Sequence, residues 1–343
     1  MRWRAGHPRW LIIGLVFLAT TINYLDRQTL SVLAPALIDE FHMSNEAYAR
    51  VISAFMLAYT VMNGVSGPLI DRLGTRLGYA LTMLWWSAAA ALHALTRGAW
   101  SLGAFRFLLG IGAAGFLWLI VWWMFYYTPA ADLRVATEKK PSLMSLLRSR
   151  FVWSFTVAKI FIDPVWYFYI FWFPEYLKRA RHFDLAAIGK YAWIPFLVAG
   201  FGNILGGWVS GILLHRGLSL TVARKSAVTG FTLLMAAAIP AVLVDDARMS
   251  VALVSVAMLG YTGVSANMLA IPADVFPGSV VASIWGLASM GSGFGGMVFA
   301  LATGWVLDRY SYVPVFFGFG LIPLIAAFIL WAFLGPLPPA ESS

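Results

Sequence analysis

Long apolar runs alternate with short polar connections along most of the chain. A helix that spans a membrane needs about 20 consecutive apolar residues, and ten runs have this length. They cover residues 10–37, 47–70, 77–96, 99–127, 151–177, 186–214, 222–244, 249–270, 280–305 and 314–334. The pattern therefore predicts an all-α membrane protein with about ten spans.

The fourth run is longer than a membrane requires. Between Trp100 and Tyr127 the only charged residue is Arg106. At about 1.5 Å per residue this stretch reaches about 42 Å, against a hydrocarbon core of about 30 Å. Division at the glycines of residues 110–115 would leave two pieces too short to span. We therefore expect one long helix, tilted or kinked.

One polar connection divides the chain. Residues 128–150 contain two prolines and five basic residues. We predict an incomplete amino-terminal bundle of about four spans in residues 1–127, a cytoplasmic linker at 128–150 and a carboxy-terminal six-helix bundle in 151–343. Leucines alternating with Arg148 and Arg150 favour a short helix lying on the membrane surface at the end of the linker.

Composition supports a membrane protein and excludes several other classes. The chain is 61% hydrophobic and 11% charged, whereas about a quarter of the residues in soluble domains are charged. Its net charge of +9 is spread over short loops, so we expect no nucleic-acid partner. Basic residues favour the side of the termini, which predicts that both termini are cytoplasmic. The basic cluster at 178–181 opposes this assignment.

Other chemistry has little support in the sequence. There are no cysteines and the five histidines are scattered, so we expect neither a metal site nor another cofactor. No nucleophile and base are arranged for catalysis, and we expect no enzyme. The glycine-rich residues 291–296 resemble a dinucleotide loop, but they lie in an apolar run, where small residues allow close helix packing.

Two opposite charges, Asp26 and Arg27, interrupt the first apolar run. Charged residues at this depth cost several kcal/mol each unless they face protein or a water-filled cavity. Helical spacing gathers one polar stripe, which consists of Thr20, Asn23, Tyr24, Arg27 and Ser31. The stripe predicts a substrate or ion path. A purely structural ion pair is the alternative, although burying a charge pair is a poor source of stability.

A second pair of opposite charges lies in the fifth run. Lys159 and Asp163 are four residues apart on one helical face, close enough to form a pair. A structural pair and a role in proton coupling are equally open for Asp163. We also predict that Trp166 and Asn267 line a cavity and contact substrate.

Two motifs carry a resemblance to a known family. The second run ends in the pattern G-x-L-x-D-R-x-G-x-R, formed by Gly67, Asp71, Arg72, Gly74 and Arg76. The fourth run contains R-x-x-x-G-x-G, which begins at Arg106, and a weaker copy of the first pattern lies at 207–216. These motifs resemble the signatures of the major facilitator superfamily, where they have gating and structural roles.

Within that superfamily the chain is similar to anion:cation symporters of hexuronates and other sugar acids. The likeness is carried by residues 22–27, 163–168, 193–196 and 272–277. It implies two helical bundles around a central cavity, alternating access, and uptake of a small organic anion with protons through the inner membrane. It also implies that Arg27, Tyr24 and Tyr59 bind substrate and that Asp26 carries the proton. We expect a monomer in the lipid bilayer.

The chain departs from this family in two ways. Members have twelve helices, and they usually carry a glutamate where this chain has Ala113. After Gly115 the sequence continues with Phe116 as though near the end of helix six. We therefore predict an internal deletion between helices four and six that removes two passes and preserves the orientation downstream. The alternative function is a non-transporting remnant, which could be a deletion product, a scaffold or a sensor.

Overall fold

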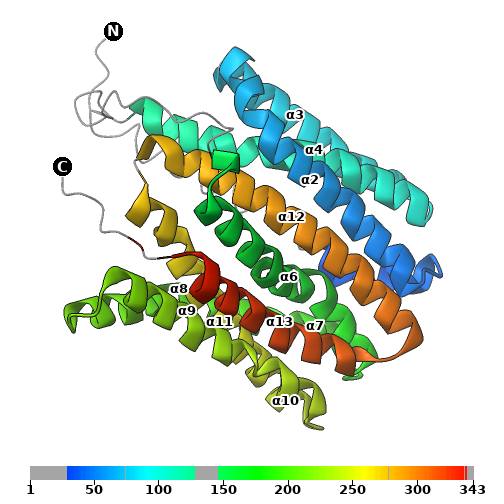
Figure 1. The fold of residues 1–343 in the computed structure, drawn as a ribbon. Helices are drawn as coiled ribbons and strands as arrows, with labels where there is room; N and C mark the ends of the chain where they lie inside the picture. Colours follow the sequence, from blue (N-terminus) through cyan, green and yellow to red (C-terminus); the bar gives the residue numbers. More distant parts are fainter. Residues whose placement is uncertain (1–28, 74, 128–145, 277, 336, 338–343) are drawn as a thin grey trace, which may run out of the picture.

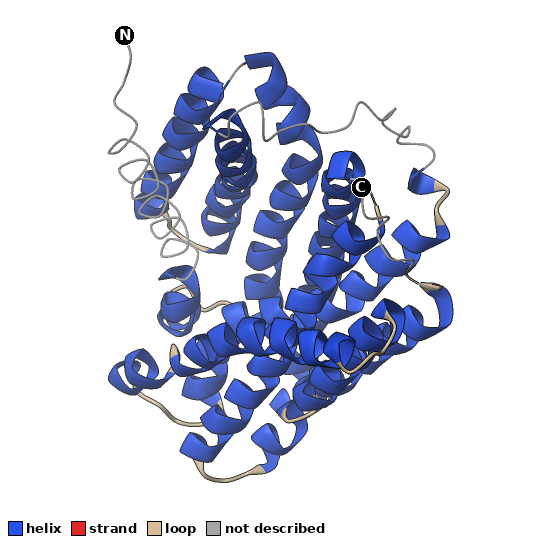
Figure 2. Ribbon diagram, turned by 90° about the vertical axis from the view of Figure 1, so that its left-hand side faces the viewer, coloured by secondary structure: helices blue, strands red, loops and turns tan. Residues whose placement is uncertain are grey.

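The structure is a computed structural model that describes residues 29–73, 75–127, 146–276, 278–335 and 337. Within these ranges, the side chains of residues 64–80, 114–127, 278–279 and 282 are not described. No strand occurs among the described residues, and every coloured element in Figure 2 is a helix or a loop. The predicted all-α class is confirmed.

Among the described residues, the amino-terminal part contains the end of the first predicted span, three further α-helices and one 3-10 helix. Residues 29–40 are helical. They are followed by α2 (Asn45–Leu73), α3 (Thr75–Leu92), the short 3-10 helix η1 (His93–Leu95) and α4 (Ala99–Tyr127). Because α4 is one continuous helix of 29 residues, the prediction of a single long fourth helix is confirmed.

From residue 150 onward the described residues form eight helices, in the order seen in Figure 1. They are α6 (Arg150–Arg179), α7 (Leu185–Tyr191), α8 (Ile194–His215), α9 (Leu220–Met235), α10 (Ala238–Leu243), α11 (Ala247–Val275), α12 (Gly278–Arg309) and α13 (Tyr312–Phe333). Two predicted spans are each divided by a turn, one between α7 and α8 and one between α9 and α10. Pro195 lies in the first helical turn of α8, directly after the break between α7 and α8. At this position a missing N–H costs no hydrogen bond.

The two parts meet mainly where α2 packs along α12 (Figure 1). In the amino-terminal part α4 lies against α2 and α3, and in the carboxy-terminal part α12 and α13 pack on α6 while α11 packs on α8 and α9. A Cβ added at Gly304 of α12 would lie 2.6 Å from Cβ of Ala49 on α2. A Cβ added at Gly296 would overlap the side chain of Met56. The predicted close packing around the glycine-rich residues 291–296 is confirmed.

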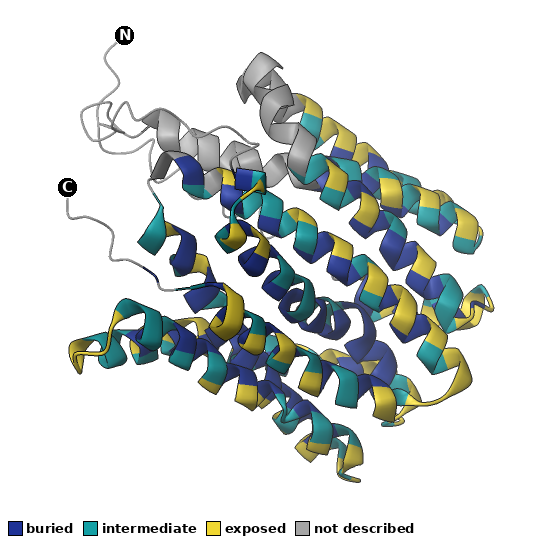
Figure 3. Cartoon of the chain, viewed as in Figure 1, coloured by how far each residue is buried: buried dark blue, intermediate teal, exposed yellow. Residues whose placement is uncertain are grey.

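The described helices suit a bilayer. Five segments are long and apolar enough to cross a membrane: Leu185–His215, Leu220–Leu243, Ala247–Val275, Ser283–Arg309 and Tyr312–Phe333. Large apolar side chains such as Ile204 and Phe328 are well exposed on the outer faces, where lipid would cover them. The buried residues follow the helix contacts, most densely along α6 (Figure 3).

Candidate functional site

The candidate site lies at the middle of α6. The side chain of Ser149 caps this helix by accepting a hydrogen bond from the N–H of Val152. Pro164 lies inside the helix and has no N–H to donate to the carbonyl of Ile160. α12 approaches at this point, because a Cβ added at Gly295 would lie 2.5 Å from that carbonyl oxygen. The glycine has no side chain to hold the helices apart, and the proline leaves the Ile160 carbonyl without its usual donor. The backbones of α6 and α12 can therefore approach each other closely beside the site.

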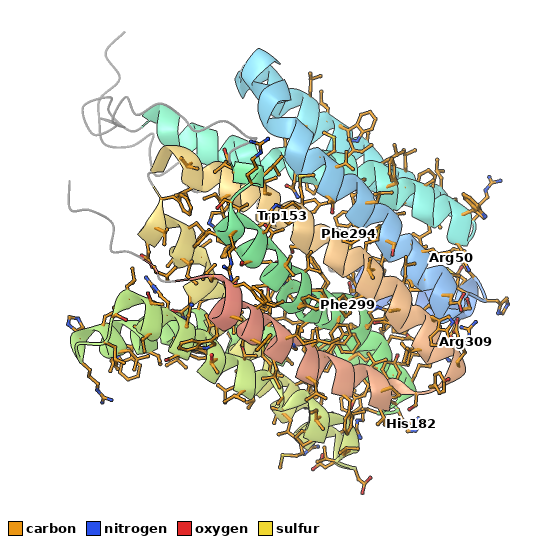
Figure 4. The ribbon with its side chains drawn as sticks, in the orientation of Figure 1. Arg50, Trp153, His182, Phe294, Phe299 and Arg309 are labelled. Carbon is orange, nitrogen blue, oxygen red and sulfur yellow. The ribbon has the colours of Figure 1, made fainter. Side chains whose placement is uncertain are left out.

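Figure 4 labels two aromatic side chains of α12, Phe294 and Phe299. The ring of Phe299 meets the ring of Phe161 on α6 at 6.4 Å, in an edge-on arrangement. Phe294 is 54% exposed. Of the two, the Phe299 ring therefore supplies the apolar contact with α6.

Lys159 and Asp163 form the predicted pair. Nζ of Lys159 lies 2.8 Å from Oδ2 of Asp163, and each side chain is 9% exposed. The hydroxyl of Tyr261, on α11, donates a hydrogen bond of 3.2 Å to Oδ1 of Asp163. Both carboxylate oxygens therefore have a partner. Asp163 is also near the centre of the predicted span 151–177, at a depth where an ionisable side chain is costly unless it has partners or faces a cavity.

Aromatic rings enclose this pair. Nζ of Lys159 lies 5.0 Å from the centre of the Trp285 ring on α12, within the range of a cation–π contact. Trp166 stacks on Tyr261 at 5.1 Å with an angle of 17° between the rings, and its edge meets Phe196 of α8. The structure thus brings together two predicted residues, Asp163 and Trp166. Such a site offers opposite charges together with apolar faces that suit a sugar ring.

Asn267, the third predicted residue of this part, lies elsewhere. It is fully buried, and its amide Nδ2 donates to the carbonyls of Gly206 on α8 and Gly263 on α11 at 2.9 Å and 3.0 Å. Its Oδ1 accepts a hydrogen bond of 3.4 Å from Arg224. In this conformation the Asn267 amide links α8, α9 and α11. Contact with substrate stays a prediction.

Arg224 also forms an ion pair that the sequence pattern did not predict. Its Nε lies 2.8 Å from Oδ2 of Asp274, and its NH1 donates to the hydroxyl of Ser210 at 3.0 Å. These residues join the start of α9 to the end of α11 and to α8. The only signal in the sequence was the weak second copy of the loop motif, which includes Ser210.

Among the site residues predicted in the amino-terminal part, the structure describes the side chains of Tyr59 and Arg106. Tyr59 lies on α2 and stacks on Phe55 with ring centres 5.9 Å apart. Arg106 lies on α4, is 4% exposed and lines a cavity of about 210 Å³ together with Thr29 and His93. Arg106 is therefore buried inside the amino-terminal part, and its gating or structural role stays a prediction.

Several predicted site residues lie outside the residues that the structure describes. Tyr24, Asp26, Arg27 and Gly74 are not among the described residues, and neither is most of the linker. For Gly67, Asp71 and Arg72 at the end of α2, and for Arg76 in α3, only the helical backbone is described. The motif therefore lies at the junction of α2 and α3, as predicted, and the roles of these side chains stay predictions.

Polar contacts join the two parts at the end of the molecule where α2 begins and α12 ends, which we call the Asp308 end. The carboxylate of Asp308 accepts hydrogen bonds from the backbone N–H of Asn45 and of Glu46, at 2.9 Å and 2.8 Å, and one from the Asn45 side chain. Arg309 pairs with Glu46 at 2.5 Å. Figure 4 shows Arg309 and Arg50 of α2 at this same end. Asp308 thus caps a helix of the other part.

The same end holds the basic cluster that opposed the charge bias. Asp39 pairs with Lys178 at 2.5 Å and also with Arg179, which binds Glu175 through Nε at 2.9 Å. The hydrogen bond from Lys178 is the main cause that lowers the pKa of Asp39 below its ordinary value, and the Arg179 charge adds to it. These residues hold the helix of residues 29–40 against the end of α6. The basic cluster therefore has a structural explanation as part of a contact between the two parts.

A cavity of about 520 Å³ adjoins these contacts and is lined by residues of both parts, among them Asn45, Glu175, Tyr176 and Tyr312. Glu175 is 1% exposed, and its Oε2 has no hydrogen-bond partner in the structure. Deeper in, the hydroxyl of Tyr48 on α2 donates to the carbonyl of Phe171 on α6 at 3.0 Å. The Asp308 end is closed by contacts at its surface and beneath it.

Comparison with known proteins agrees with this fold. Residues 16–118 match the sequence model of the Major Facilitator Superfamily. The hexuronate transporter of Escherichia coli (strain K12) is 28% identical, over 97% of this chain and 95% of its own length. The galacturonate transporter of Dickeya chrysanthemi is 26% identical, over 66% of this chain and 89% of its own.

A solved structure has the same arrangement of helices. It is a bacterial homolog of the human lysosomal transporter Spinster in an inward-facing and occupied conformation, with a TM-score of 0.72 at 16% identity. The superposition covers 96% of this chain and 97% of that chain. At this identity the likeness concerns the fold.

The alignment with the hexuronate transporter is longer than this chain. It runs over 413 positions and the chain has 343 residues, so at least 70 positions have no residue here. Because nearly all of both proteins is covered, the shortfall is internal, in agreement with the predicted deletion. The superfamily match ends at residue 118, three residues beyond Gly115. The position of the deletion after Gly115 stays a prediction.

These findings make the chain a multi-pass protein of the inner membrane whose relatives transport sugar acids. The superfamily match, the all-helical architecture and the superposition agree with one another. Residues 16–118 are therefore similar to the Major Facilitator Superfamily, and the chain as a whole has the fold of the solved transporter structure.

Proposed function

We propose that this chain is a secondary transporter built to take up a hexuronate or a related sugar acid together with protons. The observation that carries the proposal is the buried cluster of Lys159, Asp163 and Tyr261 at mid-depth. Ionisable residues at this depth mark substrate and proton paths in membrane proteins. The similarity to transporters of hexuronate and galacturonate supports the choice of substrate class.

The chemistry of the predicted residues suits a sugar acid. An arginine such as Arg27 can bind a carboxylate through two parallel hydrogen bonds. Tyrosines such as Tyr24 and Tyr59 offer hydroxyls and an apolar face for the sugar ring. Asp26 and Asp163 are the carboxylates that would carry protons. In this proposal the protein acts as a monomer without a cofactor and has no enzymatic activity.

The contacts at the Asp308 end support alternating access. With both termini in the cytoplasm, α2 begins and α12 ends on the outer side. The closed Asp308 end then corresponds to a state shut toward the outside, and transport would require Asp308 and Asp39 to release their partners. Surface ion pairs contribute only about 0 to 1 kcal/mol each, so such contacts can break and form during a cycle.

A second candidate is favoured by the length of the chain. Compared with the hexuronate transporter, at least 70 aligned positions are missing. Loss of two passes would remove one wall of the amino-terminal bundle and turn part of the polar stripe toward lipid, which is unfavourable. A remnant of this kind could bind substrate at its remaining residues without moving it.

Binding by the purified chain tests the proposal directly. We expect isothermal titration calorimetry in detergent to detect binding of D-galacturonate or D-glucuronate. The neutral sugar D-galactose serves as the matched control, because it lacks only the carboxylate of galacturonate. Equal binding of galactose and galacturonate, or no binding of either acid, would contradict the proposal.

A further inference from the structure

The ion pair in α6 consists of two charged side chains that are both nearly buried. Taking two charges out of water costs several kcal/mol per ion, and the attraction between them often does no more than offset this cost. Lys159 and Asp163 are nevertheless both nearly buried, and they are neighbours on one helix. The ion pair itself lies within α6, and its links to other helices are the neutral contacts with Tyr261 of α11 and Trp285 of α12. Neutral contacts of this kind do not need a buried pair of charges, so helix packing alone explains the charge of Lys159 poorly.

We propose that Lys159 binds the carboxylate of the transported anion by exchanging partners. When Asp163 takes up a proton, it loses its charge and releases the Lys159 ammonium, which then pairs with the substrate carboxylate. This inference rests on the proposed function and adds to it a second cationic residue for the substrate, in the carboxy-terminal part.

The exchange keeps the charge of the site constant. Before it, the ammonium of Lys159 balances the carboxylate of Asp163. Afterwards the same ammonium balances the anion, and Asp163 is neutral. At no stage does a buried charge lack a partner, which would cost several kcal/mol. One proton is therefore taken up at Asp163 for each anion that Lys159 binds.

Lys159 also has a partner that the proposed exchange does not affect, the ring of Trp285. Its Nζ stays over the ring of Trp285 at 5.0 Å, and this contact needs no carboxylate. Trp285 is itself fixed by an edge-on contact with Phe155 of α6. The ammonium can therefore keep its position while its anionic partner changes.

Few other groups can take part in this titration. Among the described residues, the titratable groups that face Asp163 are Lys159 on its own helix and Tyr261 on α11, with Tyr167 beside Tyr261. Toward this cluster α12 presents the Trp285 ring and α8 presents Phe196, and neither of these rings titrates.

The test is calorimetric binding of D-galacturonate to the full chain, repeated in two buffers of different ionisation enthalpy to count the protons taken up. We expect Lys159→Gln to weaken binding about tenfold or more, as loss of a charged hydrogen bond does. The matched control is Lys225→Gln. Lys225 is 4% exposed and lies 5.4 Å from the Trp331 ring, but its Nζ donates to a backbone carbonyl. We expect this control to bind as the wild type does.

Asp163→Asn separates partner exchange from simple attraction. This variant mimics the protonated carboxyl, so we expect it to bind at neutral pH as well as the wild type does at acidic pH. We also expect it to take up about one proton fewer per anion. Asp26→Asn is a parallel variant that reports on the other carboxylate.

If Lys159→Gln does not fold, the double variant Lys159→Gln with Asp163→Asn removes both charges and leaves no buried charge unpaired. We expect this variant to fold and still to bind weakly. Wild-type affinity in Lys159→Gln or in the double variant, or unchanged proton uptake in Asp163→Asn, would overturn the inference alone. Absence of binding by the wild type would overturn the proposed function, and this inference with it.

Discussion

At the scale of single residues, Asp163 and Asn267 show two ways in which a polar group is held inside this membrane protein. The carboxylate of Asp163 has one charged and one neutral side-chain partner, Lys159 and Tyr261. The amide of Asn267 is held by backbone carbonyls of two helices and by Arg224. The first arrangement suits chemistry during a cycle, and the second suits a permanent link.

The permanent character of the Asn267 link can be measured. Asn267→Ala would leave the carbonyl of Gly206 without its donor, and we expect a loss of about 1 to 3 kcal/mol in the free energy of unfolding. The measurement is unfolding in detergent, with Asn203→Ala as control, since Asn203 is an exposed residue of α8. Unchanged stability together with lost galacturonate binding would instead identify Asn267 as a substrate ligand.

Arg27 is the predicted substrate ligand in the amino-terminal part. In a version with the missing passes restored, we expect Arg27→Lys to fold and to bind hexuronate about tenfold more weakly or worse, because lysine cannot form the two parallel hydrogen bonds of a guanidinium. Titration calorimetry on the restored protein measures this. Binding equal to that of the unchanged restored protein would remove Arg27 from the site.

At the scale of elements, the contact of Asp308 with α2 joins the two parts of the molecule. Asp308→Ala removes the acceptor of three hydrogen bonds at the start of α2, and loss of a cap costs about 0.5 to 2 kcal/mol. We expect the Asp308 end to open in a larger fraction of molecules. Spin labels at Arg97→Cys and Tyr310→Cys report this separation, since the chain has no other cysteine.

Asp246→Ala is the matched control for this measurement. Asp246 caps α11 within its own part of the molecule, through the N–H groups of Arg248 and Met249. We expect its removal to leave the distance between the labels unchanged. A distance distribution that Asp308→Ala does not alter would show that the contact does not hold the two parts together.

The Asp39 contact has a definite pH dependence. The pKa of Asp39 is lowered from about 3.8, mainly by the hydrogen bond from Lys178. A lowered pKa means that the ionised carboxylate is favoured in the closed state. The contact therefore contributes fully above the ordinary pKa and is lost only as the pH falls through the lowered value. We expect the label distance at the Asp308 end to be independent of pH between about 5 and 8. Opening within this range that Asp39→Asn abolishes would contradict this account.

The sequence predicted elements better than it predicted contacts. The apolar run at 99–127 predicted α4 because the length of a run reports directly on helix length. The break between α7 and α8 was missed because Pro195 and its neighbours are apolar and leave the run uninterrupted. The Asp308 contact was missed because its partners are 262 and 263 residues away, and no local pattern records such a distance. Lys159 and Asp163 could be paired in advance since they are one helical turn apart.

At the scale of the whole molecule, the chain combines a candidate site in the carboxy-terminal part with a shortened amino-terminal part. α6, α8, α11 and α12 supply the Lys159 and Asp163 cluster and its aromatic surroundings. The amino-terminal part should supply Arg27 and Asp26, but at least 70 positions of the hexuronate transporter have no counterpart in this chain. We therefore expect the missing passes to impair transport more than binding.

The most direct measurement is uptake of radiolabelled galacturonate into liposomes, with and without a pH gradient. It compares this 343-residue chain with a version in which the missing passes are inserted after Gly115. We predict gradient-driven accumulation by the restored protein and little or none by this chain, because an opened amino-terminal bundle would expose its polar stripe to lipid. Equal gradient-driven uptake by the two proteins, or none by the restored one, would contradict the account.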